Sequence, residues 1–474
     1  MIVMVFSSFV FISIFFPVVL ILHTVIPNRK VRNGLLLVAS LLFYAYGEPV
    51  YIFLMLASTL LNYLLALLIA RGSSKWLMVI AVAANLAILG VFKYAGFLVS
   101  NLNSILQLSL PVPAISLPIG ISFFTFQALS YVIDVYRGDV AVQKSYWKLL
   151  LYISFFPQLI AGPIVRYKDV ALEIDNRTVD MRAVAFGLRR FIAGLAKKVL
   201  IANAMGAAAD YIFNHGAANI NILAAWIGAV AYLMQIYYDF SAYSDMAIGL
   251  GKMCGFHFKE NFNHPYISTT IQEFWRRWHI SLSSFFRDYV YIPLGGNRKG
   301  KTRTVLNRII VFFLTGLWHG ANWTFVIWGL FHGFFLLLEE YIPLIRKLPV
   351  FLRRIYTLLV VTVGFVIFRA DTISEAGLFL AKMFGGFDFA PASMSFAIQA
   401  LTPFFLVMLL AAVLCCGIFD KFTQRVRSLE EKPQLTAREN ILQNATFLVA
   451  IALLVWCMLR LAGGSYNPFI YFRF

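Results

Sequence analysis

Seven histidines are the main candidates for acid–base chemistry in this sequence, because imidazole titrates near neutral pH. His319 differs from the others, since it lies inside the apolar stretch 309–338 beside the small residues Gly316, Gly320 and Ala321. An ionisable side chain in an apolar segment is costly and indicates a functional site. His319 is therefore the candidate general base. The alternative is a histidine that only makes a hydrogen bond between helices.

A second candidate, His279, lies in a segment rich in arginine and tryptophan. Its neighbours include Trp275, Arg276 and Arg277. The segment 271–308 is strongly basic and reads as an amphipathic interfacial helix followed by a glycine-containing turn. Its arginines could bind anionic lipid headgroups or the phosphates of a nucleotide-bearing donor, and both interpretations remain open. His279 is either a second site histidine or a structural donor to a headgroup.

Other chemistry has little support in the sequence. It contains no Gly-x-Ser-x-Gly elbow, no phosphate-binding Walker loop and no His-Glu-x-x-His motif. The four cysteines predict neither a disulfide nor a zinc site, so no metal is expected. Asp239 and Asp245 are exceptional carboxylates in an apolar segment, and they could pair with arginines or line a cavity. His332 could line the cavity of His319 or serve a structural role.

The elements that must position these residues lie in a membrane. Of 474 residues, 61% are hydrophobic and 13% charged, whereas soluble domains carry about 25% charged residues. Apolar segments of spanning length predict an all-α, polytopic membrane protein with roughly ten or more membrane helices, the first of them within 3–26. The absence of an internal repeat or linker predicts one domain over residues 1–474. The net charge of +18 lies in short loops, which favours membrane orientation and lipid contact over nucleic-acid binding.

Charge bias in the loops predicts the orientation of the chain. Basic residues cluster at 29–32, 71–75 and 420–440, so these loops are expected in the cytoplasm and the tail 463–474 outside. Two segments, 117–137 and 152–166, carry polar residues, Pro and Gly within apolar sequence. Such backbone at membrane depth must be buried in protein or line a cavity. They are either re-entrant segments lining a site or interfacial loops.

Several long motifs in order resemble the membrane-bound O-acyltransferase family. They are LPIGISFFTFQALSYVIDVYRG, FFPQLIAGPIVR, YYDFSAYSDMAIGLG, NFNHPY, FWRRWHISLSSFFRDYVYIPLGGNRKG and GLWHGANWTFVIWGLFHG. The match is closest to the bacterial branch of alginate O-acetylation proteins and peptidoglycan O-acetyltransferases. The resemblance implies a ring of tilted helices around a central tunnel, with a cytoplasmic acyl donor and an acceptor reaching the catalytic histidine from opposite sides. Within it, His319 matches the family's invariant histidine and His279 its second motif position.

The tail NPFIYFRF resembles the C-terminal motif of this branch and the end of a small partner protein in teichoic-acid D-alanylation systems. That comparison implies an acyl-carrying role for Tyr471, since a phenol can accept an acyl group and pass it on. The alternative is an aromatic anchor at the membrane interface. The predicted catalytic residues are thus His319, His279 and Tyr471. The predicted substrate-binding residues are Trp275, Arg276, Arg277, Trp318 and Asn322.

The sequence predicts a multi-pass enzyme of the cell membrane that transfers an acyl group, expected to be acetyl, to hydroxyls of an extracytoplasmic polysaccharide. Acetyl-CoA or another acyl thioester is the expected donor, and no permanently bound cofactor is expected. An exopolysaccharide such as alginate or cellulose, or peptidoglycan, would be the acceptor, reached directly or through a periplasmic partner transferase. The alternatives are a polysaccharide or lipid transporter without chemistry, and D-alanyl transfer to teichoic acid.

Overall fold

The computed structural model describes residues 4–432, 434–464 and 466–470, and within these ranges every regular element is a helix. The chain forms two compact units. Unit 1 comprises Met1–Phe191 with Tyr243–Lys259, and unit 2 comprises Ile192–Ala242 with Glu260–Phe474. The expectation of one domain over 1–474 stays a prediction, and each unit is described by itself.

Seven helices of the described chain are long and apolar enough to cross a membrane, and a bent helix pair would make an eighth. They are Tyr51–Gly72, Lys75–Leu106, Met181–Asn214, Ile222–Met253, Trp323–Tyr341, Val350–Arg369 and Ala437–Ala462, with the bent pair Pro391–Ala400 and Pro403–Cys415. The expected first span contains the shorter apolar helix Phe11–Val25. The all-α, polytopic prediction is confirmed, whereas the count of roughly ten or more spans remains a prediction.

Unit 1 is built on apolar helices, and the side chains of Asn28 and Ser74 cap the starts of two of them. Its elements are η1 (Phe11–Phe15), α1 (Phe16–Val25), α2 (Arg29–Gly47), α3 (Tyr51–Gly72), α4 (Lys75–Leu106), α5 (Ile121–Arg137), α6 (Tyr146–Ser154), α7 (Phe156–Leu159) and α8 (Tyr167–Asn176). Asn28 caps α2 by accepting from the Lys30 amide at 2.8 Å. Helices α9 (Met181–Ala196) and α11 (Ile222–Met253) contribute residues to both units.

The two irregular segments predicted at 117–137 and 152–166 lie in unit 1. The first becomes α5, which starts after Gly120 in a left-handed conformation and is buried over most of its length. The second breaks into α6, the short α7 and a non-helical stretch to Arg166. Its backbone finds partners inside the protein, since the Ser40 hydroxyl accepts from the Phe156 amide and Tyr152 donates to the Val165 carbonyl. Burial in protein is how such backbone is tolerated.

Unit 2 carries all the described candidate site residues. Its elements are η2 (Lys197–Ala202), α10 (Asn203–Asn214), η3 (Ala217–Asn219), η4 (Pro265–Ile267), α12 (Ile271–Arg277), α13 (Ile280–Phe286), η5 (Arg287–Tyr291), α14 (Lys301–His319), α15 (Trp323–Tyr341), α16 (Leu344–Lys347), α17 (Val350–Arg369), α18 (Ile373–Gly385), α19 (Pro391–Ala400), α20 (Pro403–Cys415), α21 (Asp420–Glu431) and α22 (Ala437–Ala462).

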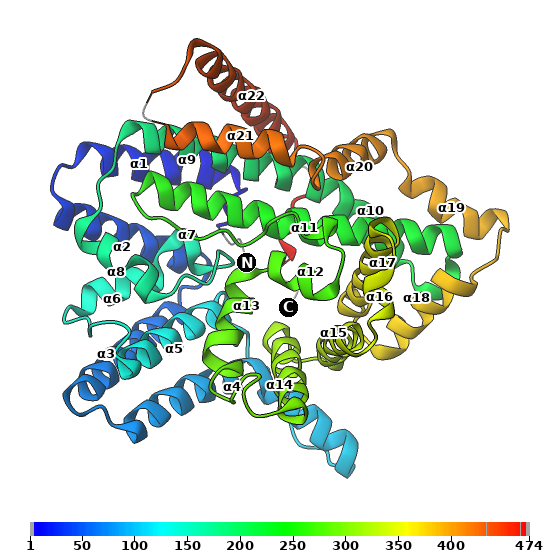
Figure 1. Ribbon diagram of the computed structural model, residues 1–474, viewed down its shortest axis with the longest axis horizontal. Coiled ribbons are helices and arrows are strands. Elements are labelled where there is room, and N and C mark those ends of the chain that lie inside the picture. Colours follow the sequence, from blue (N-terminus) through cyan, green and yellow to red (C-terminus); the bar gives the residue numbers. More distant parts are fainter. Residues whose placement is uncertain (1–3, 433, 465, 471–474) are drawn as a thin grey trace. The chain divides into compact units, whose positions relative to one another are not determined.

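Helices α14 and α15 form a closely packed pair in unit 2 (Figure 1). The contact depends on glycine, because a Cβ at Gly316 would overlap the Phe325 carbonyl and one at Gly329 would overlap the Phe312 carbonyl. Small residues permit such close approach of helix backbones in membrane proteins. The space beside Gly316 is therefore occupied by the backbone of α15.

The segment 271–308 differs from the single amphipathic helix that was predicted. It forms two short helices, α12 and α13, separated at Trp278 and His279, followed by η5, turns and the start of α14. Thr270 caps α12 by accepting from the Glu273 amide at 3.0 Å, and the Glu339 carboxylate accepts from the Ile271 amide at 2.7 Å. The break arises because His279 takes a left-handed conformation with φ 44°.

Candidate active site

His319 is the last residue of α14 and lies in a cage of aromatic rings. The rings of Trp318, Trp328 and Phe368 meet its imidazole edge to face at centroid distances of 5.0–5.1 Å. The side chain is 9% exposed and lines a narrow cavity. The other lining residues are Ile236, Phe240, Trp278, Trp328, Phe365, Phe368 and Ile470.

This cavity has a volume of about 10 Å³, which holds about one water molecule. An acyl thioester therefore requires side chains of the cage to move before it can reach the imidazole. The lining of the cavity is apolar apart from His319 and the indole N–H groups of its tryptophans. In such surroundings an electrostatic interaction with a charged transition state is stronger than in water.

His279 is held in one tautomer by Asn261. The Asn261 Oδ1 atom accepts from the Ser281 backbone amide at 3.1 Å and from the Ser281 hydroxyl at 2.8 Å. An atom that accepts from a backbone N–H is the oxygen of the side-chain amide, so His279 Nδ1, 3.2 Å away, must carry the proton that it donates. The lone pair of His279 then lies on Nε2, which has no hydrogen-bond partner among the described residues.

Burial keeps His279 neutral. The ring is 1% exposed, and its desolvation lowers the pKa to about 3. A histidine with so low a pKa is a poor proton carrier at neutral pH but a competent hydrogen-bond acceptor. The geometry thus favours an orienting role for Nε2, in contrast to a lipid-headgroup donor, which would need an exposed ring.

Aromatic contacts join the two histidines. Trp318 meets the His279 ring at 5.9 Å and the His319 ring at 5.0 Å. Phe240 lies 4.6 Å from His279 and also lines the His319 cavity. The structure therefore brings His279, Trp318 and His319 together, as the sequence predicted for one site.

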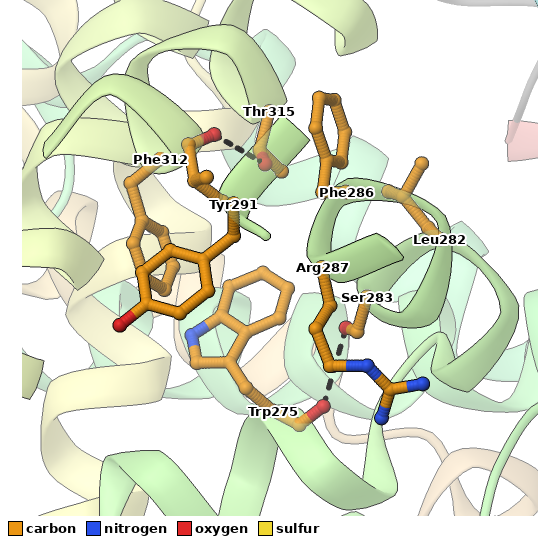
Figure 2. Close-up of a pocket in the computed structure, with 9 residues that line it drawn as sticks. Trp275, Leu282, Ser283, Phe286, Arg287, Tyr291, Phe312 and Thr315 are labelled. Atoms are coloured by element: carbon orange, nitrogen blue, oxygen red, sulfur yellow. Dashed lines mark hydrogen bonds between the residues drawn. The ribbon is translucent and has the colours of Figure 1, made fainter. Parts of the chain in front are cut away.

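A second, larger pocket of about 160 Å³ lies between α12, α13, η5 and α14. Figure 2 shows the indole of Trp275 between Phe312 and Tyr291 on one side and Phe286 and Leu282 on the other. The pocket is mostly apolar, with Ser283, Thr315 and Arg287 as its polar residues. Arg287 is largely exposed and pairs with Asp288 at 2.6 Å.

A contact between two tryptophans connects the lining of the pocket to the lining of the His319 cavity. Trp275 lines the pocket and meets Trp328 at 5.7 Å, and Trp328 meets His319 at 5.0 Å. His332 packs against the same two tryptophans, each at 5.2 Å, and does not line the His319 cavity. The geometry therefore favours a structural role for His332.

The remaining predicted binding residues differ in their surroundings. Arg277 is tied to the Glu273 carboxylate at 2.9 Å and the Asn263 carbonyl at 3.1 Å, which is a structural role. Arg276 is exposed. Asn322 caps α15 by accepting from the Thr324 amide and donates to the Asp371 carbonyl at 2.8 Å. These contacts explain Asn322 without a ligand.

Tyr471 lies outside the described residues, but the segment before it is described. Ile470 is 6% exposed and lines the His319 cavity. Its amide donates to the Asp239 carboxylate at 2.9 Å. Asp239 pairs with Lys198 rather than with an arginine, whereas Asp245 in unit 1 pairs with Arg190 as predicted.

Sequence reasoning missed three residues that shape this site. Asn261 belongs to the NFNHPY motif, but nothing in its spacing relates it to His279, eighteen residues away. Trp328 and Phe368 resemble the many other aromatic residues of apolar helices, and only the packing of α15 and α17 brings them to His319. Their one signal in the sequence is the GLWHGANWTFVIWG motif, which contains Trp328.

Comparisons with known proteins identify the family of the chain. The model of the membrane-bound O-acyltransferase family matches residues 141–380. The chain is 41% identical to a "probable alginate O-acetylase AlgI" of Pseudomonas putida, over 99% of this chain and 100% of the relative. It is 37% identical to a peptidoglycan O-acetyltransferase of Helicobacter pylori, over 81% and 80%. It is 31% identical to a teichoic acid D-alanyltransferase of Bacillus subtilis, over 45% and 57%. The chain therefore belongs to the membrane-bound O-acyltransferase family and is a multi-pass membrane O-acyltransferase.

Proposed function

We propose that this enzyme moves an acetyl group from cytoplasmic acetyl-CoA to hydroxyls of an extracytoplasmic polysaccharide. The observation that carries the proposal is His319 in its aromatic cage, at the end of a helix in a membrane O-acyltransferase chain. The names of the relatives that match four fifths or more of the chain support acetyl as the acyl group and a polysaccharide as the acceptor. The stretch shared with the D-alanyltransferase covers less than half of the chain, so D-alanyl transfer has weaker support.

The pocket around Trp275 is the proposed donor site. Its apolar lining suits the uncharged arm of an acyl thioester, and Arg287 at its exposed side could pair with a phosphate of CoA. The thioester would reach His319 by displacement of the Trp275–Trp328 contact. Arg277 is a poorer phosphate ligand, because Glu273 already neutralises it. Anionic lipid headgroups remain a second ligand for the exposed arginines of this segment.

The chemistry assigns a role to each histidine. His319 takes the proton from an attacking hydroxyl, whose oxygen forms a bond to the thioester carbonyl carbon. The carbon–sulfur bond then breaks, and the proton returns from His319 to the leaving thiolate, so that CoA departs as the thiol. His279 accepts a hydrogen bond at Nε2 from another donor of the bound substrate, because the single proton of the attacking hydroxyl goes to His319. Such acid–base catalysis is typically worth about 10²–10⁴-fold.

The attacking hydroxyl belongs to Tyr471 in the first half of the proposed reaction. A phenol ester formed there has a good leaving group and would transfer its acetyl group to a sugar hydroxyl, directly or through a periplasmic partner transferase. The support is indirect: Ile470, the residue before Tyr471, lines the His319 cavity. The loop charges favour an extracytoplasmic tail in the cell membrane.

The test is His319→Ala in purified protein in lipid nanodiscs, with release of CoA from acetyl-CoA as the readout. We expect at least a 100-fold loss. His215→Ala is the matched control, since His215 is an exposed histidine of the same unit whose ring bonds the Tyr211 carbonyl one turn earlier. Full CoA release by His319→Ala would refute the assignment. A transporter without chemistry would carry polysaccharide or lipid while the wild type releases no CoA.

A further inference from the structure

A buried ion pair in unit 2 has an unusual set of partners. Lys198 in η2 and Asp239 in α11 lie 2.9 Å apart, and their side chains are 3% and 1% exposed. Both residues belong to helices of spanning length and composition. A buried pair is costly unless its remaining donors and acceptors are satisfied, and an ionisable residue in a membrane segment indicates function.

The C-terminal segment supplies the missing partners from its backbone. The Asp239 Oδ2 atom accepts from the Ile470 amide at 2.9 Å, and the Lys198 ammonium donates to the Pro468 carbonyl. The pair therefore binds the segment in one chain direction, because the Asp239 carboxylate accepts from an N–H group and the Lys198 ammonium donates to a carbonyl. Hydrogen bonds to charged groups are the stronger class of hydrogen bond.

Further contacts fix the approach of the segment. Asn203 donates to the Asn467 side chain at 3.1 Å, and the Tyr466 hydroxyl donates to the Asp210 carboxylate. Asp210 is itself paired with Arg369 at 2.7 Å. The segment therefore enters the interior of unit 2 through a series of polar contacts, and its last described residues, Phe469 and Ile470, are buried.

The position reached by the segment is the candidate active site. Ile470 lines the cavity of His319 together with Phe240, the residue that follows Asp239. Two consecutive residues of α11 thus connect the ion pair to the cavity, because Asp239 binds the Ile470 amide and Phe240 lines the cavity. An ion pair that served only to join η2 to α11 would not require hydrogen bonds from its charged groups to the backbone of the C-terminal segment.

We propose that Lys198 and Asp239 form a clamp that holds the segment Asn467–Ile470 in the wall of the His319 cavity. The chain end is then a built-in part of the active site, and the two charged residues are positioning residues for acyl transfer. The positioning role in acyl transfer rests on the proposed function, whereas the clamp depends only on the contacts of Lys198 and Asp239 with the tail. The pair acts through the tail and does not touch the reacting atoms.

The first test is protection of the tail in the purified full-length protein. Carboxypeptidase trims the chain end, and intact-mass spectrometry follows the loss of residues. In the wild type we expect trimming to stop before Ile470. Asp239→Asn weakens a hydrogen bond to a charged group, which predicts trimming past Ile470 on the order of 10- to 100-fold faster. Asp245→Asn is the matched control, because it breaks another ion pair of the same helix, with Arg190, and should leave trimming unchanged.

A charge reversal separates a clamp from a simple ionic contact. Lys198→Asp with Asp239→Lys keeps the pair but presents a carboxylate to the Pro468 carbonyl and an ammonium to the Ile470 amide. An ionic contact between helices predicts restored protection, whereas the clamp predicts continued release. Should Asp239→Asn fail to fold, Ile470→Pro leaves the pair intact but removes the amide donor, together with the Ile470 side chain, and it should release the tail equally.

The catalytic readout is the rate of CoA release at varied acetyl-CoA. We expect Asp239→Asn to lower kcat at least 10-fold with little change in KM, because the donor pocket around Trp275 does not include the clamp. Wild-type protection of the tail in a folded Asp239→Asn protein, or in Ile470→Pro, would overturn the clamp. Tail release with an unchanged kcat would overturn its positioning role. Equal CoA release by wild type and His319→Ala would instead refute the proposed function, and trimming would still decide the clamp.

Discussion

Replacing His279 by glycine, alanine and asparagine separates its backbone role from its chemistry. His279 has φ 44°, a left-handed conformation that costs an L-residue with a Cβ roughly 1–2 kcal/mol, whereas glycine adopts it freely. All three substitutions lose the ring contacts with Phe240 and Trp318. The difference between glycine and alanine therefore isolates the backbone, and glycine should be the more stable. That order is the reverse of the one in a helix interior.

The expected difference is measurable by thermal unfolding in detergent. With about 2–4 °C per kcal/mol for a unit of this size, His279→Gly should melt about 2–8 °C above His279→Ala. Asparagine tolerates the left-handed region, and its amide can still donate to Asn261 Oδ1, so His279→Asn should be at least as stable as His279→Ala. All three variants should lose CoA release by about 10²–10⁴-fold, because none offers a lone pair at the position of Nε2 with the same geometry.

His264 provides the matched control. It has φ 45° and begins a 3₁₀ turn in the same unit, but its ring bonds Asp420 and the Cys416 carbonyl instead of the site. His264→Gly and His264→Ala should repeat the stability order while keeping activity. If His279→Ala had the same melting temperature as His279→Gly, the site would not require the left-handed conformation between α12 and α13. Full CoA release by the glycine variant would remove His279 from the chemistry.

Three further outcomes follow from the structure. Gly329→Ala brings a Cβ against the Phe312 carbonyl and should destabilise the α14–α15 pair by about 1–3 kcal/mol in thermal melts, whereas Gly377→Ala, with open space around it, should not. Asn322→Ala should cost about 1 kcal/mol as a lost helix cap with an unchanged KM for acetyl-CoA, and a raised KM would favour the binding role instead. Because burial keeps His279 neutral, the fold loses stability as the pH falls from about 6.5 toward about 3, where the unfolded chain takes up the proton. Melting curves across that range should show a shallower acid loss for His279→Asn.

The sequence by itself indicated that the protein lies in a membrane and which chemistry it carries out. The apolar composition and the lengths of the apolar segments required helices in a membrane, since unpaired backbone is not tolerated in lipid. His319 was found from the sequence because an ionisable residue in an apolar helix is rare and costly. The ordered motifs around it indicated the family, and the family and the all-α membrane fold are confirmed.

Only the tertiary structure decided how the site is built. The break at His279 depends on Asn261, which is neither a sequence neighbour of His279 nor related to it by helical spacing. This break divides the predicted amphipathic helix into two short helices. The partner of Asp239 is a lysine from a distant π-helical turn, and the backbone that completes the pair comes from the end of the chain. Helical periodicity reports which face of a segment is apolar, but it carries no information on which remote segment covers that face. Contacts across hundreds of residues are set by packing, and they bring the tail and aromatic residues to the His319 cavity, with His279 in contact through Trp318.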